Sequence, residues 1–163
     1  MLHNVSGNLV TDKTYDIFCH QTNCCGVMGA GIASQIKNVY PEVAEADKIY
    51  CKLSAKEGKK ILGTNIYVKT KDGRTCVNMY AQQDYGTNSR KTDYVAFQAC
   101  LDRLTSKLSI SSIDLKIGFP YGVGCGLGGG DWNIICEMIS KFASKVSQEV
   151  YIVRYNANKK GDC

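Results

Sequence analysis

The chain has 163 residues, of which 44% are hydrophobic and 21% charged, and this length and composition predict a single compact domain with a buried core. Its formal net charge of +5 comes from scattered lysines and arginines, which permits weak contact with nucleic acid but does not indicate a nucleic-acid groove. No apolar run reaches the length of a membrane span and the N-terminus does not resemble a signal peptide, so we expect a soluble, cytoplasmic protein without membrane contact.

In chain order, the hydrophobic pattern first predicts strands at residues 2–6 and 15–20. Apolar residues at helical spacing then predict a helix that ends near Tyr40 and a second one opened by Pro41. Strands follow at 65–69 and 75–80, and the segment Lys71-Asp72-Gly73 between them is typical of a hairpin turn.

The second half of the chain predicts a helix, a strand, a helix and a strand. The third helix carries an apolar stripe from Phe97 to Leu108, with Thr92 or Asp93 as its N-cap. A strand at 113–119 precedes a fourth helix capped by Asp131, a last strand covers 149–155, and 156–163 are expected to form a flexible tail. Because the hairpin pairs its strands antiparallel, the sheet must be mixed, with helices on both faces.

Two glycine-rich turns, at residues 26–32 and 122–130, each follow a predicted strand and open a predicted helix. Glycine allows backbone N–H groups at a helix N-terminus to approach an anion closely, because no Cβ lies in the way. One such turn is a weak signal. Two turns on one sheet predict a ligand with two anionic groups, such as a diphosphate held between two backbone cradles.

Known nucleotide motifs do not account for these turns. A Rossmann fingerprint fails because Ser34 occupies the third glycine position and the acidic residue Asp47 lies inside a predicted helix. The Walker pattern is absent, since neither turn is followed by Lys-Ser or Lys-Thr. A nicotinamide dehydrogenase and a P-loop enzyme are therefore disfavoured.

The nine cysteines are an odd number, and several lie in core-like runs, so we expect free thiols. Cys19, His20, Cys24 and Cys25 lie close together, but the chain has no CxxC pair, and no metal is expected. Cys25 or Cys125 as a nucleophile is a weak hypothesis, because no base is evident beside either thiol.

Four segments together resemble a macrodomain, and the likeness covers nearly the whole chain. They are Gly7-Asn8-Leu9, His20-Gln21-Thr22-Asn23, Met28-Gly29-Ala30-Gly31-Ile32-Ala33 and Pro120-Tyr121-Gly122-Val123-Gly124-Cys125-Gly126-Leu127. The branch that looks most similar contains ADP-ribose 1″-phosphate phosphatases, the terminal ADP-ribose glycohydrolase and DNA-directed ADP-ribosyl hydrolases. The resemblance implies an α/β fold, a three-layer α/β/α sandwich with a mixed, mostly parallel six-stranded sheet. It also implies a single macrodomain over 1–163, a monomer that binds ADP-ribose or an ADP-ribosylated molecule and needs no cofactor.

The resemblance also implies a set of ligand contacts. Asn8 would accept from the adenine amino group in place of the usual Asp, Leu9 would offer its backbone N–H, and Asn23 would bind the distal ribose. Tyr155 would stack on adenine, although an ordinary strand-end aromatic is as good an interpretation. The first turn would wrap the distal ribose and one phosphate through Met28, Gly29, Ala30, Gly31 and Ile32. The second would hold the diphosphate through Pro120, Gly122, Val123, Gly124, Cys125, Gly126 and Leu127.

Catalysis is less clearly indicated than binding. In the glycohydrolase branch a lysine after the fourth strand and an aspartate after Gly-Cys-Gly-Leu act on the distal ribose, whereas this chain has Ala81-Gln82-Gln83 and Gly128 there. The remaining catalytic candidates are Asn23, His20 as an acid or base beside a nucleophilic water, and Asp84. Hydrolysis of an ADP-ribose derivative at the distal ribose is the favoured hypothesis. A module that binds ADP-ribose without catalysis and an RNA-binding module stay as alternatives.

Overall fold

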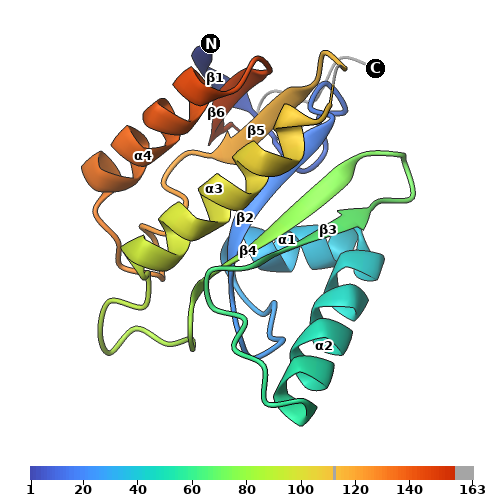
Figure 1. The fold of residues 1–163 in the computed structure, drawn as a ribbon, viewed down its shortest axis with the longest axis vertical. Helices are drawn as coiled ribbons and strands as arrows, with labels where there is room; N and C mark the ends of the chain where they lie inside the picture. The colour runs from blue at the N-terminus through green and yellow to red at the C-terminus, as the bar shows by residue number, and fades with distance from the viewer. Residues whose placement is uncertain (112, 157–163) are drawn as a thin grey trace.

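The computed structural model describes residues 1–111 and 113–156, which form six strands and four helices (Figure 1). The elements are β1 (Leu2–Gly7), β2 (Ile17–Asn23), α1 (Gly31–Val39), α2 (Pro41–Lys56), β3 (Asn65–Lys69), β4 (Thr75–Gln82), α3 (Tyr94–Ser109), β5 (Lys116–Pro120), α4 (Trp132–Lys145) and β6 (Glu149–Tyr155). The predicted tail lies outside the described residues except for Asn156, whose N–H donates to the carbonyl of Gly7 (3.0 Å).

The strands form one mixed sheet in the order β1-β6-β5-β2-β4-β3. All neighbours are parallel except β3 and β4, which are joined by the predicted hairpin. In that hairpin the N–H of Thr70 donates to the carbonyl of Arg74 (2.9 Å), and Gly73 has a φ of 86°. The predicted mixed, mostly parallel six-stranded sheet is therefore confirmed.

Helices cover both faces of the sheet, as the predicted three-layer α/β/α sandwich requires (Figure 1). On one face, α3 and α4 pack through residues such as Leu101 and Ile139 against Met79 of β4. On the other face, α1 and α2 place Ile36 and Val43 against Phe18 of β2. The fold class predicted from sequence is confirmed.

Helix starts follow the sequence closely, whereas strand bounds differ from prediction, most of all in β2 and β5. The side chain of Asp93 accepts from the N–H of Ala96 (2.9 Å), and Asp131 caps α4 in the same way. Thr92 is not the cap. β2 runs three residues past the predicted end because its pairing with β4 continues to Asn23, and β5 begins later than predicted, at Lys116.

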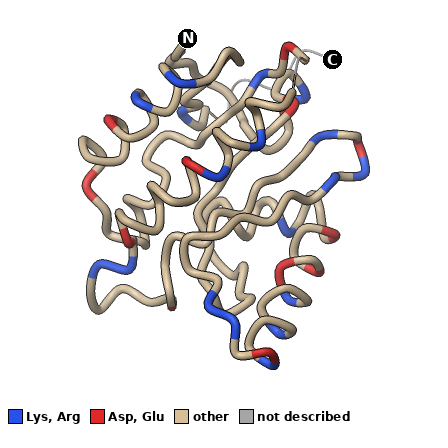
Figure 2. The backbone as a smooth tube through the Cα atoms, viewed as in Figure 1, with Lys and Arg blue, Asp and Glu red and all other residues tan. Residues whose placement is uncertain are grey.

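Charged residues of both signs are interspersed along the helices and loops (Figure 2). Within the described part of the chain, no helix is long and apolar enough to cross a membrane. The eight cysteines at described positions are free thiols, and no three metal-ligating side chains among those residues gather into a possible metal site.

Candidate functional site

Both glycine-rich turns contribute to the wall of one cavity of about 500 Å³. The cavity lies where the adjacent parallel strands β2 and β5 end, which is the usual place for a ligand in an open α/β sheet. Its lining consists of Gln21, Thr22, Asn23, Val27, Gly29, Ala30, Gly31, Ile32, Ala33, Gln82, Tyr85, Gly86, Thr87, Pro120, Tyr121, Gly122, Val123, Gly124, Gly126, Leu127 and Gly128. Two backbone turns therefore face a common space of ligand size.

The side chain of Asn23 holds the first turn. Its Oδ1 accepts from the backbone N–H groups of Cys25 (3.0 Å) and Val27 (3.4 Å), and its Nδ2 donates to the carbonyl of Val27 (2.8 Å). Asn23 is buried at the cavity wall, and the second N–H of its amide has no partner among the described residues. One donor of Asn23 thus stays free for a ligand while the rest of the amide closes the turn.

The first turn rests on α2, and a group of buried polar residues from β2, β4 and α2 lies nearby. Gly26 lies against α2 with a φ of 73°, so a Cβ at this position would meet the Cβ of Cys51 at 3.4 Å. Nearby, the Tyr80 hydroxyl donates to Asp47 Oδ1 (2.6 Å), and burial raises the pKa of the Asp47 carboxyl. We call His20, Asn78, Asp47 and Tyr80 the polar floor of the first turn.

The second turn folds around the carbonyl of Gly124. This oxygen accepts from the N–H of Gly130 (2.9 Å) and from the Thr92 hydroxyl (2.5 Å). Gly122, Gly124 and Gly129 all have positive φ, between 69° and 75°, which residues with a Cβ rarely adopt. A Cβ on Gly128 would lie 2.7 Å from the same Gly124 carbonyl, so the turn closes only with glycine there.

A chain of side-chain hydrogen bonds joins the second turn to β2 and β4. Gln21 Nε2 donates to Thr92 Oγ1 (2.8 Å) and to Gln82 Oε1 (2.8 Å), while the Thr92 hydroxyl donates onward to Gly124. The backbone N–H groups of Lys91 and Thr92 both donate to the carbonyl of Gly128 (2.9 and 3.0 Å). The loop before α3 and the second turn are therefore fixed to each other.

The structure brings most of the predicted ligand residues to the cavity. Those that line it are Asn23, Gly29, Ala30, Gly31, Ile32, Pro120, Gly122, Val123, Gly124, Gly126 and Leu127. The predicted residues that do not line it are Asn8, Leu9, His20, Met28, Asp84, Cys125 and Tyr155. The roles assigned to individual residues stay predictions.

His20 does not face the cavity, contrary to the expectation for an acid or base. Its side chain is fully buried, and its Nε2 lies 2.6 Å from Asn78 Oδ1 on the neighbouring strand β4. Burial lowers the pKa of His20 to about 4, so the imidazole is neutral at physiological pH. This environment suits a structural donor to Asn78 better than proton exchange with a ligand.

The residues predicted to contact adenine are also placed differently from expectation. Asn8 Oδ1 already accepts from the N–H groups of Val10 (3.1 Å) and Thr11 (3.3 Å), so it closes a turn after β1. Tyr155 is 61% exposed and lies outside the lining. Tyr121 does line the cavity, and the Arg154 guanidinium lies 3.7 Å from the centre of its ring.

Sequence reasoning missed several lining residues, chiefly Gln21, Tyr85, Thr87 and Tyr121. Tyr121 stands inside the second motif and was available as a signal, whereas nothing local marks Tyr85 and Thr87.

Burial raises the pKa of the Cys125 thiol to about 11, so this sulfur is protonated at neutral pH and is a poor nucleophile.

Several known proteins are similar in sequence to this chain. No family model matches the chain. An uncharacterised 17.5 kDa protein of Enterobacteria phage T4 is 30% identical over 136 residues, covering 82% of this chain and 83% of that protein. A Mycobacterium tuberculosis protein named DNA ADP-ribosyl glycohydrolase is 33% identical over 141 residues, covering 84% of this chain but only 37% of that protein.

Solved structures agree with the sequence comparison. The macrodomain of Mycobacterium tuberculosis DarG superimposes with a TM-score of 0.78 at 24% identity, covering 96% of this chain and 99% of that one. Thermosipho africanus DarTG in complex with ADP-ribose gives a TM-score of 0.71 at 20% identity, covering 92% of this chain and 40% of that one. The sheet order, the two glycine turns and these solved structures lead to one conclusion: the chain has the macrodomain fold.

Proposed function

We propose that the cavity binds ADP-ribose, free or attached to another molecule, with its diphosphate between the two glycine turns. The observation that carries the proposal is that residues 29–33 of the first turn and residues 122–124 and 126–128 of the second line one cavity of about 500 Å³. Glycines at these positions expose backbone N–H groups, and such nests favour phosphate oxygens. The similarity to a protein solved with ADP-ribose supports the same ligand.

The sheet order suggests how the ligand lies. With the diphosphate above the ends of β2 and β5, one end of the ligand extends toward β6 and the other toward β4. We assign the adenine to the β6 end, where Tyr121 lies under Arg154, with Asn8, Leu9 and Tyr155 as the more distant candidates. The distal ribose then lies near the free N–H of Asn23, beside β4.

A second candidate function is hydrolysis at the distal ribose, favoured by similarity to a protein named as a glycohydrolase. In this scheme water attacks the anomeric carbon and breaks its bond to the attached group, or attacks the phosphorus of a 1″-phosphate and releases inorganic phosphate. The glycine turns orient the substrate and stabilise the developing charge. Asn23 would position the distal ribose, and Asp84 is the carboxylate on the loop that continues into the lining. In this scheme His20 does not contact the ligand and contributes only as a member of the polar floor.

Binding without catalysis is favoured by the chemistry of the wall. Among the described residues, no Asp, Glu, His, Lys, Arg or Cys side chain lines the cavity. General acid and base catalysis most often uses one of these groups within hydrogen-bond reach, directly or through one water. Hydrolysis by this protein would therefore depend more on positioning of the substrate than on proton transfer by a side chain of the cavity wall.

Calorimetry with ADP-ribose and with ADP tests the binding proposal, and poly(A) serves as the competing nucleic-acid ligand. We expect saturable binding of ADP-ribose at one site per chain, whereas salt-dependent binding of poly(A) with no response to ADP-ribose would refute the proposal. Incubation with ADP-ribose 1″-phosphate and with ADP-ribosylated DNA then separates the two functions. Release of phosphate or of ADP-ribose supports hydrolysis, and saturable binding without product supports a non-catalytic module.

A further inference from the structure

The loop between β4 and α3 forms part of the cavity wall, although no sequence motif marks it. Three consecutive residues, Tyr85, Gly86 and Thr87, line the cavity. Tyr85 is 59% exposed, so a large aromatic ring stands open at the cavity edge. We call residues 84–91 the arch, because one of its ends is bonded to the second glycine turn and the other lies next to the segment that leads into the first.

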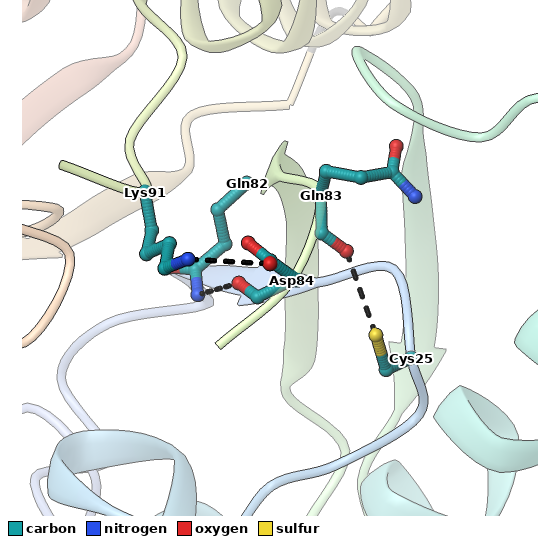
Figure 3. A network of polar contacts seen from close by, with 5 residues as sticks. All are labelled: Cys25, Gln82, Gln83, Asp84 and Lys91. Carbon is teal, nitrogen blue, oxygen red and sulfur yellow. Dashed lines mark hydrogen bonds and ion pairs between the residues drawn. The ribbon is translucent and has the colours of Figure 1, made fainter. Parts of the chain in front are cut away.

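The first end of the arch is joined to the segment that follows β2. The N–H of Cys24 donates to the carbonyl of Gln83 (3.2 Å), and the thiol of Cys25 donates to the same oxygen (3.5 Å). Gln82 Nε2 donates to the carbonyl of Asp84 (2.9 Å), which turns the chain away from the strand (Figure 3). The residue before the arch is therefore bonded to the segment that leads into the first glycine turn.

The second end is joined to the other glycine turn and back to the first end. The N–H of Lys91 donates to the carbonyl of Gly128, as described above. The Lys91 ammonium lies 3.2 Å from Asp84 Oδ2, across the base of the arch (Figure 3). The Lys91 side chain is only 10% exposed, whereas that of Asp84 is 60% exposed. The stem of Lys91 is therefore well covered, and its ion pair with the exposed Asp84 carboxylate joins the two ends of the arch at the protein surface.

The topology places the arch at one end of the ligand. β4 lies beside β2 on the side opposite β5 and β6, and the arch continues directly from β4. A diphosphate between the two turns would leave the adenine end toward β6 and the distal ribose toward the arch. Tyr85 and Thr87 are therefore on the side where ADP-ribose differs from ADP.

We infer that the arch is the specificity element of the cavity, which recognises the distal ribose and distinguishes ADP-ribose from ADP. This inference rests on the proposed function. Tyr85 is the specificity-determining residue, since an exposed aromatic ring packs well on the apolar face of a sugar. Asp84 and Lys91 are positioning residues, because their ion pair sets the distance between the ends of the arch.

The test is calorimetric titration of the full chain with ADP-ribose and, separately, with ADP. Tyr85→Ala is expected to weaken ADP-ribose binding by about 10-fold and to change ADP binding by less than about twofold. Tyr85→Phe keeps the ring and should retain the wild-type preference. Equal losses for both ligands, or no loss for either, would overturn the inference.

Lys91→Met removes the ion pair while keeping the length of the side chain, and Lys91→Arg restores the charge. We expect the Met variant to lose discrimination between the two ligands and the Arg variant to recover it. Lys59→Met, which breaks the exposed pair with Glu57, is the matched control and should leave both affinities unchanged. A Lys91→Met protein with wild-type discrimination would remove the ion pair from the inference and overturn that part of it.

The titrations distinguish a wrong proposed function from a wrong arch inference. If the wild-type protein binds neither ADP-ribose nor ADP, the proposed function is wrong and the arch inference falls with it. If the wild type binds both ligands equally well, the proposed cavity stands and the arch inference alone is refuted. Thermal unfolding of each variant checks that a lost preference reflects the cavity and not a lost fold.

Discussion

The two glycine turns line the same cavity but are held in place by different means. Asn23, three residues before Gly26, closes the first turn, and α2 with its polar floor supports it from below. The second turn is held by side chains from distant parts of the chain, since Thr92 donates to Gly124 and Gln21 donates to Thr92. One cradle is thus largely local in sequence and the other is tertiary.

The difference extends to their chemistry. The polar floor of the first turn contains His20 and Asp47, both fully buried. Protonation at low pH can therefore place a positive charge on His20. The hydrogen-bond chain behind the second turn, Gln21, Gln82 and Thr92, contains no group that titrates in the physiological range. We therefore expect the two turns to respond to different perturbations.

Acidification should produce the largest effect, through the floor of the first turn. Burial lowers the pKa of His20 to about 4 from its usual 6.5, so the unfolded chain binds a proton between these pH values that the folded chain excludes. This contribution to stability is complete above pH 6.5 and is lost as pH falls. We expect the unfolding free energy to drop by about 3 kcal/mol from this group between pH 7 and pH 4. Denaturant unfolding at several pH values measures it.

The control for the acid effect is a pair of histidine variants. His20→Gln should flatten the loss of stability below pH 6.5, whereas His3→Gln, at the partly exposed pair with Glu149, should keep it. The raised pKa of Asp47 has the opposite effect on stability, because on acidification the folded state takes up this proton before the unfolded state does. The slope of unfolding free energy against pH is therefore compared between wild type and His20→Gln. Equal slopes for wild type and His20→Gln would contradict the assignment.

A methyl group on Gly128 should have the next largest effect, this time at the second turn. Its Cβ would lie 2.7 Å from the Gly124 carbonyl, a backbone atom that cannot swing away, so the turn must open. We expect Gly128→Ala to cost about 1–3 kcal/mol of unfolding free energy, as overpacking usually does. The matched control is Gly126→Ala, where a Cβ meets nothing within 4 Å. Comparable losses in the two variants would show that crowding is not the cause.

The same division between local and tertiary support explains which features could be predicted from the sequence. The first turn, its strand and its helix are contiguous, so the pattern from Asn23 to Ile32 predicted a cavity wall that the structure contains. The caps Asp93 and Asp131 were predictable for the same reason, because a cap lies within a few residues of the helix it starts.

Features that depend on tertiary contacts were not predictable in this way. Tyr85 and Thr87 line the cavity from a loop whose ends are joined by the Asp84–Lys91 ion pair, and neither the ion pair nor the arch has a local signature. The misplacement of His20 came from ending β2 too early. Once the strand continues to Asn23, the alternation of side chains puts His20 on the side of Phe18, beneath α2, and away from the face of Cys19.

Removal of one hydroxyl should weaken the second turn more gently than the added methyl does. Thr92→Val keeps the shape of a buried side chain but takes away the acceptor for Gln21 and the donor for Gly124. Because a buried amide N–H is left without its acceptor, we expect a loss of about 1–2 kcal/mol in unfolding free energy. Thr92→Ser retains the hydroxyl and should recover most of it. Should serine destabilise as much as valine, the methyl contact and not the hydrogen bond would hold the turn.

The smallest effect should come from changing one atom in the support of the first turn. Asn23→Asp keeps the oxygen that accepts from Cys25 and Val27 but loses the donor to the Val27 carbonyl, and we expect this lost hydrogen bond to cost about 1 kcal/mol beyond the cost of burying the new charge. Asn8→Asp is the matched control, because Asn8 Oδ1 also accepts from two backbone N–H groups while its Nδ2 has no partner among the described residues. Chemical denaturation above pH 7 keeps both carboxylates ionised. If Asn8→Asp lost as much stability as Asn23→Asp, the cost would come from the charge, and the local amide would not be what holds the first turn.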